Sequence, residues 1–180
     1  RLHYAYPIGL PDSLLRAIAD EPKVCRYLDM PLQHASGPML KAMKRGVTRS
    51  GQERILNRVR KFVPDISIRT TFIVGFPGES ESDFETLCDF VQSQRFDRVG
   101  VFTYSSEEGT PAAKLPGQIP EEVRFERQRI LMGLQAAISQ DNLKRWVGQS
   151  VPVLVDGPSD EHPLVLSGRM ETQAPEVDGQ

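Results

Sequence analysis

Cysteine is scarce in this 180-residue sequence, and its scarcity excludes two classes of protein. Cys25 and Cys88 lie far apart and form no C-x-x-C pair, so neither a disulfide framework nor a metal knuckle is indicated. A reducing, cytoplasmic setting is therefore the default expectation.

Long apolar runs and an excess of positive charge are also missing. No apolar stretch reaches the length of a membrane span, and the first residues show no signal-peptide pattern. The net charge of -2 argues against a protein coated in positive charge to bind nucleic acid. The 39% of hydrophobic and 26% of charged residues are typical of a globular protein of one domain, or of one domain and a small piece. Because the chain starts at Arg1 inside an apparent strand, we interpret it as a fragment of a longer protein.

The most informative segment is 68–79, which reads I-R-T-T-F-I-V-G-F-P-G-E. Ile73 and Val74 lack the polar alternation of a half-solvated strand, which predicts a strand covered on both faces, as in a parallel sheet clad by helices. Gly75, Pro77 and Gly78 then allow a sharp turn and the close approach of a ligand to the main chain. Since ligands bind at the C-terminal edge of such sheets, this turn predicts a site.

Strands and helices alternate along the first 118 residues. We expect strands at 2–6, 24–30, 68–74 and 99–104, and helices that begin near Asp12, Pro38, Ser50 and Ser82. The last two helices each open with an S-x-x-E capping box, and Cys88 falls on the inner face of the second as a core thiol. This order implies right-handed crossovers and a parallel sheet whose strand ends carry small and polar residues.

The sequence changes character after Gly117. Pro120, followed by two acids, favours the start of a long helix that runs to about Trp146. Beyond residue 150, the segments V-P-V-L-V-D-G-P and L-V-L-S-G-R-M predict two short strands, which cannot close a barrel by themselves. We therefore divide the chain into the C-terminal portion of a barrel (1–118), a connecting helix (119–148) and the first part of a small beta module (149–180).

Several motifs are similar to those of the radical S-adenosylmethionine methylthiotransferases. They are R-L-H-Y-A-Y-P, Y-L-D-M-P-L-Q-H-A-S, M-K-R-G-x-T-R, R-T-T-F-I-V-G-F-P-G-E, R-F-D-R-V-G-V-F-T-Y-S and G-T-P-A-A, and they span essentially the whole chain. The resemblance implies an α/β fold, in which the C-terminal part of a partial, TIM-like (β/α) barrel is followed by a truncated all-β, OB-like TRAM domain. It is strongest to members that modify a ribosomal protein, because tRNA-modifying members tend to carry S-P-H-P and V-Q-S-G where this chain has residues 4–7 and 32–35.

The resemblance also implies cofactors. In this family a 4Fe-4S cluster on a C-x-x-x-C-x-x-C loop reduces S-adenosylmethionine to a 5'-deoxyadenosyl radical, which takes hydrogen from the beta-carbon of an aspartate in a small-subunit ribosomal protein. A second 4Fe-4S cluster delivers sulfur, and another S-adenosylmethionine gives the methyl group. The cluster cysteines are absent from this sequence, so we expect the activity to belong to the full-length parent and this chain alone to be inactive. No metal ligand or catalytic residue is predicted here.

Four of the residues that the resemblance implicates in cofactor binding lie at the ends of predicted strands or in the polar loops that follow them. Gln33 and His34 would lie near the ribose or methionine part of S-adenosylmethionine, and the alternative is that they make only loop hydrogen bonds. Tyr104 and Ser105 would border the cofactor through ring and backbone contacts, against an equally weighted structural role.

The other three, Gly75, Phe76 and Gly78, belong to the glycine turn. They correspond to the segment that passes beside the adenine in radical enzymes. The alternative is a tight turn with no ligand. We favour the functional interpretation, because a turn alone would not need an apolar Phe76 exposed at the mouth of a barrel.

Three functions stay open. The first is methylthiolation of the ribosomal-protein aspartate. The second is methylthiolation of adenosine in tRNA, which would go with a strongly basic complete TRAM domain. The third is a non-catalytic fragment that binds RNA or the ribosome through its TRAM strands. Basic residues between Lys41 and Lys61 make ribosomal RNA a further candidate partner, although such residues ordinarily solvate outer barrel helices. We expect no membrane contact and a monomeric full-length protein.

Overall fold

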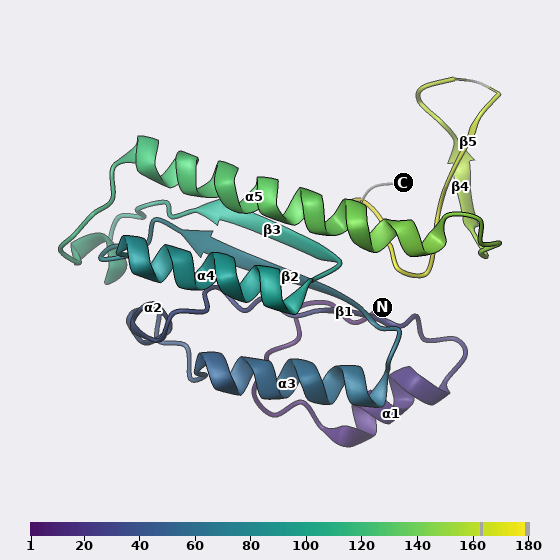
Figure 1. Ribbon diagram of the computed structural model, residues 1–180, viewed down its shortest axis with the longest axis horizontal. Coiled ribbons are helices and arrows are strands. Elements are labelled where there is room, and N and C mark those ends of the chain that lie inside the picture. Colours follow the sequence, from purple (N-terminus) through teal and green to yellow (C-terminus); the bar gives the residue numbers. More distant parts are fainter. Residues whose placement is uncertain (163, 179–180) are drawn as a thin grey trace.

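The computed structural model describes residues 1–162 and 164–178. At its centre lies a parallel sheet in the order β1-β2-β3, formed by β1 (Tyr27–Asp29), β2 (Ser67–Val74) and β3 (Arg98–Thr103). The helices are α1 (Asp12–Asp20), α2 (Gly37–Ala42), α3 (Arg49–Phe62), α4 (Glu81–Gln94) and α5 (Glu121–Leu143), with short 3-10 turns at Ala112–Lys114 and Lys144–Trp146. A separate antiparallel hairpin, β4 (Leu154–Pro158) and β5 (Leu166–Arg169), lies beyond the end of α5 (Figure 1).

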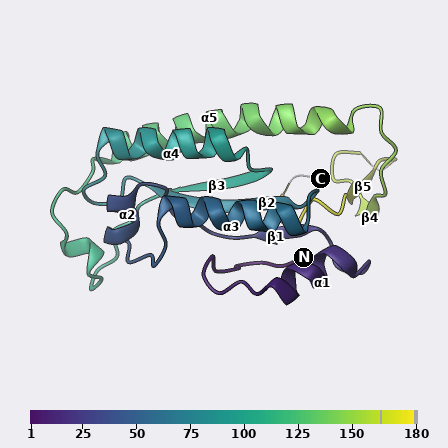
Figure 2. The ribbon, with the colours of Figure 1, turned by 60° about the horizontal axis from the view of Figure 1, so that its bottom comes forward.

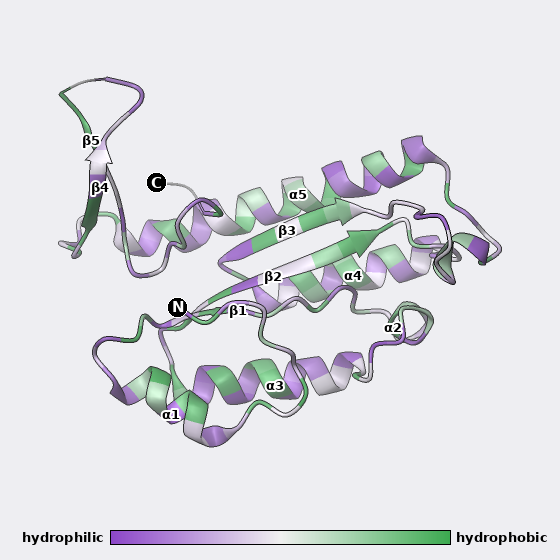
Figure 3. Cartoon of the chain, turned by 180° about the vertical axis from the view of Figure 1, so that it is seen from behind, coloured by the Kyte–Doolittle hydropathy of each residue, from purple (hydrophilic) through white to green (hydrophobic). Residues whose placement is uncertain are grey.

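The long helices cover one face of the sheet only. From behind, Figure 3 shows the strands with no helix in front of them. Phe72 and Val74 of β2 are buried on the helix side, whereas Thr71 and Ile73 are half buried on the other side. The prediction that β2 is covered on both faces is therefore wrong. A strand of a partial barrel turns its second face toward the interior of the barrel, where none of the long helices packs.

Aromatic rings join α4 to β2. The Phe72 ring meets the rings of Phe90 and Phe96 edge-on, with centroids 6.4 and 6.0 Å apart. Cys88, on the same helix, is half buried against this core, and burial together with neighbouring carboxylates raises the pKa of its thiol to about 11. The predicted core thiol is confirmed.

The N-caps of α3 and α4 both lie two residues earlier than predicted, and the capping box expected for α3 is replaced by a single cap hydrogen bond. α3 begins after Thr48, whose hydroxyl accepts a hydrogen bond from the Gly51 N–H at 3.2 Å, so Ser50 lies inside the first turn. α4 opens with a reciprocal box between Ser80 and Asp83. Two hydroxyl residues two positions apart can each cap a helix, and an aspartate at the third position serves as a glutamate does.

The first two predicted strands are shorter in the structure. Only a single parallel bridge, between Leu2 and Leu28, remains of the strand expected at 2–6. Tyr4 has a positive φ of 57°, a left-handed conformation that interrupts an extended strand. β1 itself covers only three residues of the expected 24–30.

Helix α5 packs on the sheet as well as leading to the hairpin. Its Leu131 and Ile138 belong to the main core, and it lies beside α4 (Figures 1 and 2). The side-chain amide of Gln128 donates to the Val101 carbonyl at 2.6 Å, so α5 also caps a main-chain acceptor of β3. The helix thus completes the helical layer. The domain boundaries at 118 and 148 stay a prediction.

The two predicted strands near the C-terminal end of the chain are confirmed as β4 and β5. After the hairpin the chain returns to the sheet, where the buried Asp178 carboxylate accepts a hydrogen bond from the Tyr27 hydroxyl at 2.8 Å. The same carboxylate lies 3.8 and 3.9 Å from the Nε atoms of Arg69 and Arg98. Burial, and then Asp178, raise the pKa of Tyr27 far above its ordinary value. Within the described residues, no helix is both long and apolar enough to cross a bilayer.

Candidate cofactor site at the strand ends

A cavity of about 530 Å³ lies beside the C-terminal ends of β2 and β3. Its walls come from the loop after β1, the end of α2, the two strand ends and the segment 110–115. This volume is within the range of small-molecule sites. The site thus lies at the predicted edge of the sheet. Its described lining residues are Gln33, Ala42, Met43, Lys44, Arg45, Ile73, Phe76, Phe102, Thr103, Tyr104, Ser105, Thr110, Pro111, Ala112 and Leu115.

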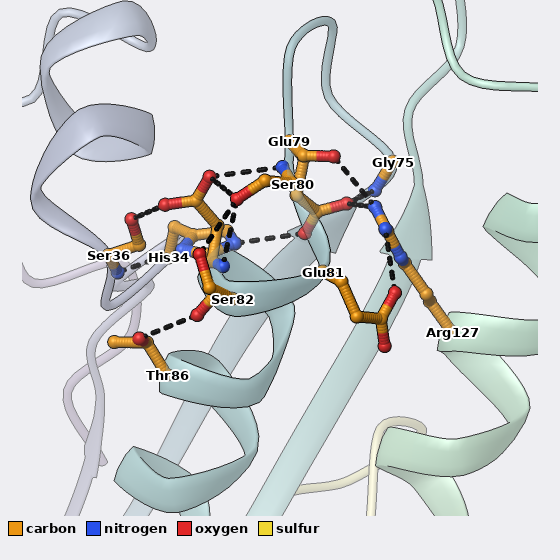
Figure 4. A network of polar contacts seen from close by, with 10 residues as sticks. His34, Ser36, Gly75, Glu79, Ser80, Glu81, Ser82, Thr86 and Arg127 are labelled. Atoms are coloured by element: carbon orange, nitrogen blue, oxygen red, sulfur yellow. Dashed lines mark hydrogen bonds and ion pairs between the residues drawn. The ribbon is translucent and has the colours of Figure 1, made fainter.

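The glycine turn after β2 is held by the buried carboxylate of Glu79 (Figure 4). Its Oε2 accepts hydrogen bonds from the Gly75 N–H and from Arg127 Nη1, the latter at 2.7 Å. Its Oε1 lies 3.0 Å from His34 Nε2. One carboxylate therefore joins the loop after β1, the turn after β2 and helix α5. A buried charge needs such partners, because an unpaired one would be strongly unfavourable.

His34 uses both ring nitrogens inside the protein. Its side chain is fully buried, and Nδ1 accepts a hydrogen bond from the Ser36 N–H at 2.9 Å. Because a backbone N–H can only donate, Nδ1 carries no proton, and Nε2 is the protonated nitrogen that donates to Glu79. In this arrangement His34 fixes the loop through the hydrogen bonds given as the alternative above, and it is not among the described residues that line the cavity. Its place near S-adenosylmethionine stays a prediction.

Gly75 and Gly78 form the predicted sharp turn. Their φ values of 71° and 83° are left-handed, a region that favours glycine. A Cβ at Gly75 would also collide with the aliphatic part of Arg124. The Gly78 N–H donates to the Gly117 carbonyl at 2.8 Å, which ties the turn to the segment before α5. Both positions therefore need glycine for their backbone conformation, and position 75 also has no room for a side chain.

Phe76 is buried, contrary to the prediction. Only 7% of the residue is exposed, and its ring packs edge-on against Tyr104 with centroids 5.2 Å apart. Met39 of α2 completes this small apolar cluster. Because α2 folds over the strand end, Phe76 becomes part of the cavity wall instead of projecting from a barrel mouth.

Gln33, Tyr104 and Ser105 all line the cavity, as expected for a cofactor site. Gln33 has a positive φ of 71° and is held by two main-chain bonds to β2, both 2.8 Å long. Ser105 is exposed and donates to Glu107 at 3.2 Å. Non-glycine residues with a strained backbone gather at functional sites, so the left-handed conformation of Gln33 favours it as a residue of the site.

Several residues of the site were not found from the sequence. An acid directly after the glycine turn was visible, but nothing indicated that Glu79 would be buried. Arg127 lies 48 positions further on, and no local pattern connects the two. Arg124, which donates to the Tyr104 carbonyl, and the lining cations Lys44 and Arg45 were also missed, although M-K-R-G is one of the motifs quoted above.

The residues present do not fit an iron–sulfur cluster. Such clusters need several cysteine thiolates together, and Cys25 and Cys88 lie in different parts of the fold. Across the described ranges, no three His, Cys, Asp or Glu side chains are placed to hold a metal ion. The cavity, in contrast, has the size and apolar walls of a site for an organic cofactor.

Comparisons with known proteins agree with this architecture. Residues 3–91 match the family model of the Radical SAM superfamily, and residues 147–180 match that of the TRAM domain. The α/β part of the chain thus carries radical SAM sequence, and TRAM sequence follows it. The predicted fold class is confirmed.

Within that superfamily the chain is similar to proteins named "Ribosomal protein uS12 methylthiotransferase RimO". The one from Anaeromyxobacter sp. (strain K) is 51% identical over 179 residues, which are 99% of this chain and 38% of the relative. The one from Geobacter sulfurreducens is 51% identical over 180 residues, 100% of this chain and 40% of the relative. The chain thus spans about 40% of the length of these relatives. Among solved structures, the Escherichia coli radical SAM enzyme coproporphyrinogen III oxidase (HemN) has a TM-score of 0.49 and 17% identity, covering 81% of this chain and 31% of that chain.

Proposed function

We propose that this chain is part of a radical S-adenosylmethionine methylthiotransferase that modifies an aspartate of ribosomal protein uS12. The observation that carries the proposal is the 51% identity, across essentially the whole chain, to proteins of that name. The matched length includes the glycine turn, the cavity and the hairpin after α5.

S-adenosylmethionine, when bound, would supply the radical that starts the reaction. The residues proposed to hold it are Gln33 and His34 in the loop after β1, Gly75, Phe76 and Gly78 in the turn after β2, and Tyr104 and Ser105 after β3. The two glycines would act by shaping the turn that carries Phe76 into the cavity wall, because their own N–H groups are bound to Glu79 and to the Gly117 carbonyl. Apolar lining residues such as Ile73 and Phe76 would exclude water from part of the cavity, which would limit side reactions of a radical.

The two 4Fe-4S clusters would be held by cysteines outside these residues. The described residues form no metal site, and the sequence has no C-x-x-x-C-x-x-C motif. We therefore propose that the 180 residues contribute the cofactor cavity and the start of the TRAM domain, and that they do not catalyse the reaction alone. A cytoplasmic location and a monomeric complete protein belong to the same proposal.

Contact with ribosomal RNA receives little support from α3. Its Arg49 pairs with Glu53 at 3.0 Å, Arg58 donates to the Leu10 carbonyl, and Arg60 donates to the Gln94 side chain at 3.0 Å. Arginines engaged within the chain are less able to neutralise phosphates. The match to the TRAM domain makes residues 147–180 the better candidate for RNA contact.

Mass spectrometry of cells that lack the gene tests the proposal. The uS12 protein and total tRNA are digested from the deletion strain and from the same strain complemented with the intact gene. Loss of the methylthio group from the uS12 aspartate, restored by complementation, is expected while tRNA stays methylthiolated. Loss from tRNA adenosine alone would instead assign the protein to the tRNA-modifying branch.

A further inference from the structure

The Tyr104 hydroxyl is buried at the cavity without a hydrogen-bond partner among the described residues. Only 8% of Tyr104 is exposed, and its ring is fixed against Phe76. A buried tyrosine hydroxyl ordinarily finds a partner. An unpaired hydroxyl in a cavity of ligand size indicates that the partner arrives with a ligand.

The cavity also carries charge of one sign. Of the described residues that line it, Lys44 and Arg45 are charged, and none is an aspartate or glutamate. Arg45 donates through Nη2 to the Pro31 carbonyl at 3.1 Å and lies over the Tyr6 ring at 4.9 Å. Its Nε is buried and has no partner within the described part of the chain. The wall therefore offers positive charge and unused donors.

Lys44 stands where a glycine is usual. It closes α2 in a Schellman motif, in which the Lys44 N–H donates to the Lys41 carbonyl at 3.0 Å and the Arg45 N–H to the Leu40 carbonyl at 2.8 Å. Its φ of 54° is left-handed, a conformation unfavourable for any side chain. Across residues 1–162 and 164–178, no carboxylate forms an ion pair with its ammonium group. A lysine in a conformation that favours glycine, beside a cavity and without an ion-pair partner in the described chain, points to a use for the side chain itself.

We propose that Lys44, Arg45 and Tyr104 form a carboxylate-binding corner of the cavity. All three offer hydrogen-bond donors, two of them charged, and a carboxylate only accepts. Two ligands of the proposed reaction carry this group: the target aspartyl side chain of the protein substrate and the methionine part of S-adenosylmethionine. The assignment to the aspartyl side chain rests on the proposed function, whereas the carboxylate chemistry rests on the cavity alone.

Binding measurements on the complete protein can separate the two sources. Dissociation constants are measured by calorimetry for a uS12 peptide containing the aspartate, for the same peptide with asparagine, for S-adenosylmethionine and for its decarboxylated analogue. The variants are Tyr104→Phe, which removes only the hydroxyl, and Lys44→Gly, which removes the side chain while favouring the backbone conformation. Tyr4→Phe is the matched control, since Tyr4 is 82% exposed and does not line the cavity.

Both variants are expected to weaken binding of one carboxylate ligand by about 10- to 100-fold and to leave its carboxylate-free analogue unchanged. A loss confined to the aspartate peptide assigns the corner to the substrate, and a loss confined to S-adenosylmethionine assigns it to the cofactor. If both variants bind all four ligands as Tyr4→Phe does, the corner does not exist. If the wild-type protein binds no uS12 peptide but shows the effect with S-adenosylmethionine, the proposed function fails while the corner stands.

Discussion

Replacing Glu79 by Gln would show how far one buried carboxylate holds the site together. The amide keeps the shape of the side chain but removes its charge. One carboxylate oxygen becomes an NH₂ group, which cannot accept the hydrogen bonds that Gly75, Arg127 and His34 donate to Glu79. The Glu79 side chain is fully buried and that of Arg127 is 8% exposed. Removing one partner of a buried ion pair costs about 3–5 kcal/mol, and here the loss is about 2–4 kcal/mol because Arg127 keeps the Glu79 carbonyl and Glu81.

Glu81→Gln is the matched control, because it removes the other carboxylate that contacts Arg127. That side chain lies 3.2 Å from the same guanidinium but is 73% exposed, so its loss should cost less than about 1 kcal/mol. Urea unfolding of the 180-residue chain, followed by far-UV circular dichroism, measures both. With an m-value of about 2 kcal/mol/M, the midpoint should fall by about 1–2 M for Glu79→Gln and by less than about 0.5 M for Glu81→Gln. Equal shifts for the two variants would refute the central place given to Glu79.

Three further predictions concern the glycine turn, a helix cap and a core thiol. Gly75→Ala should lower stability by about 1–3 kcal/mol more than Gly78→Ala in thermal melts, because both have positive φ but only Gly75 would press a Cβ into an α5 arginine. Burial would raise the pKa of Asp83, but hydrogen bonds from two serines lower it overall. The ionised Asp83 therefore stabilises the fold above its ordinary pKa of 3.8, and this stabilisation is lost as the pH falls below that value. Asp83→Asn should accordingly flatten the acid limb of a plot of stability against pH. Cys88, with a pKa of about 11, should be alkylated at pH 8 at least about tenfold more slowly in the folded than in the urea-unfolded chain, as measured by mass spectrometry with the other cysteine replaced.

Each of these has a result that contradicts it. Equal destabilisation by the two glycine substitutions would remove the steric argument for Gly75. An acid limb that Asp83→Asn leaves unchanged would show that the cap carboxylate does not titrate as argued. Equal alkylation rates of Cys88 in the folded and unfolded chains would place the thiol outside the core.

The sequence was most informative where a signal is local. β2 was found to within one residue, because an uninterrupted apolar run bounded by glycine has few other interpretations. The parallel order of the strands followed from their alternation with helices. The helix starts were placed two residues too late, because Ser50 and Ser82 can cap a helix as well as Thr48 and Ser80, which are the N-caps in the structure.

The errors concern contacts between distant segments. Phe76 was expected to be exposed at the mouth of a barrel, and it is buried because α2 and Tyr104 pack against it. The contact of His34 with Glu79 was not predicted, because the two residues lie 45 positions apart. Periodicity and capping describe a residue's neighbours along the chain, so they do not indicate which polar side chain will be buried beside which partner.

Reconstitution of the complete protein tests the central claim most directly. The purified protein, with its iron–sulfur clusters restored, is incubated with S-adenosylmethionine, sulfide, a reductant and uS12, and in parallel with tRNA. Tandem mass spectrometry should find a methylthio group on the beta-carbon of an aspartate of uS12 and none added to the tRNA. Unmodified uS12 beside methylthiolated tRNA would contradict the account.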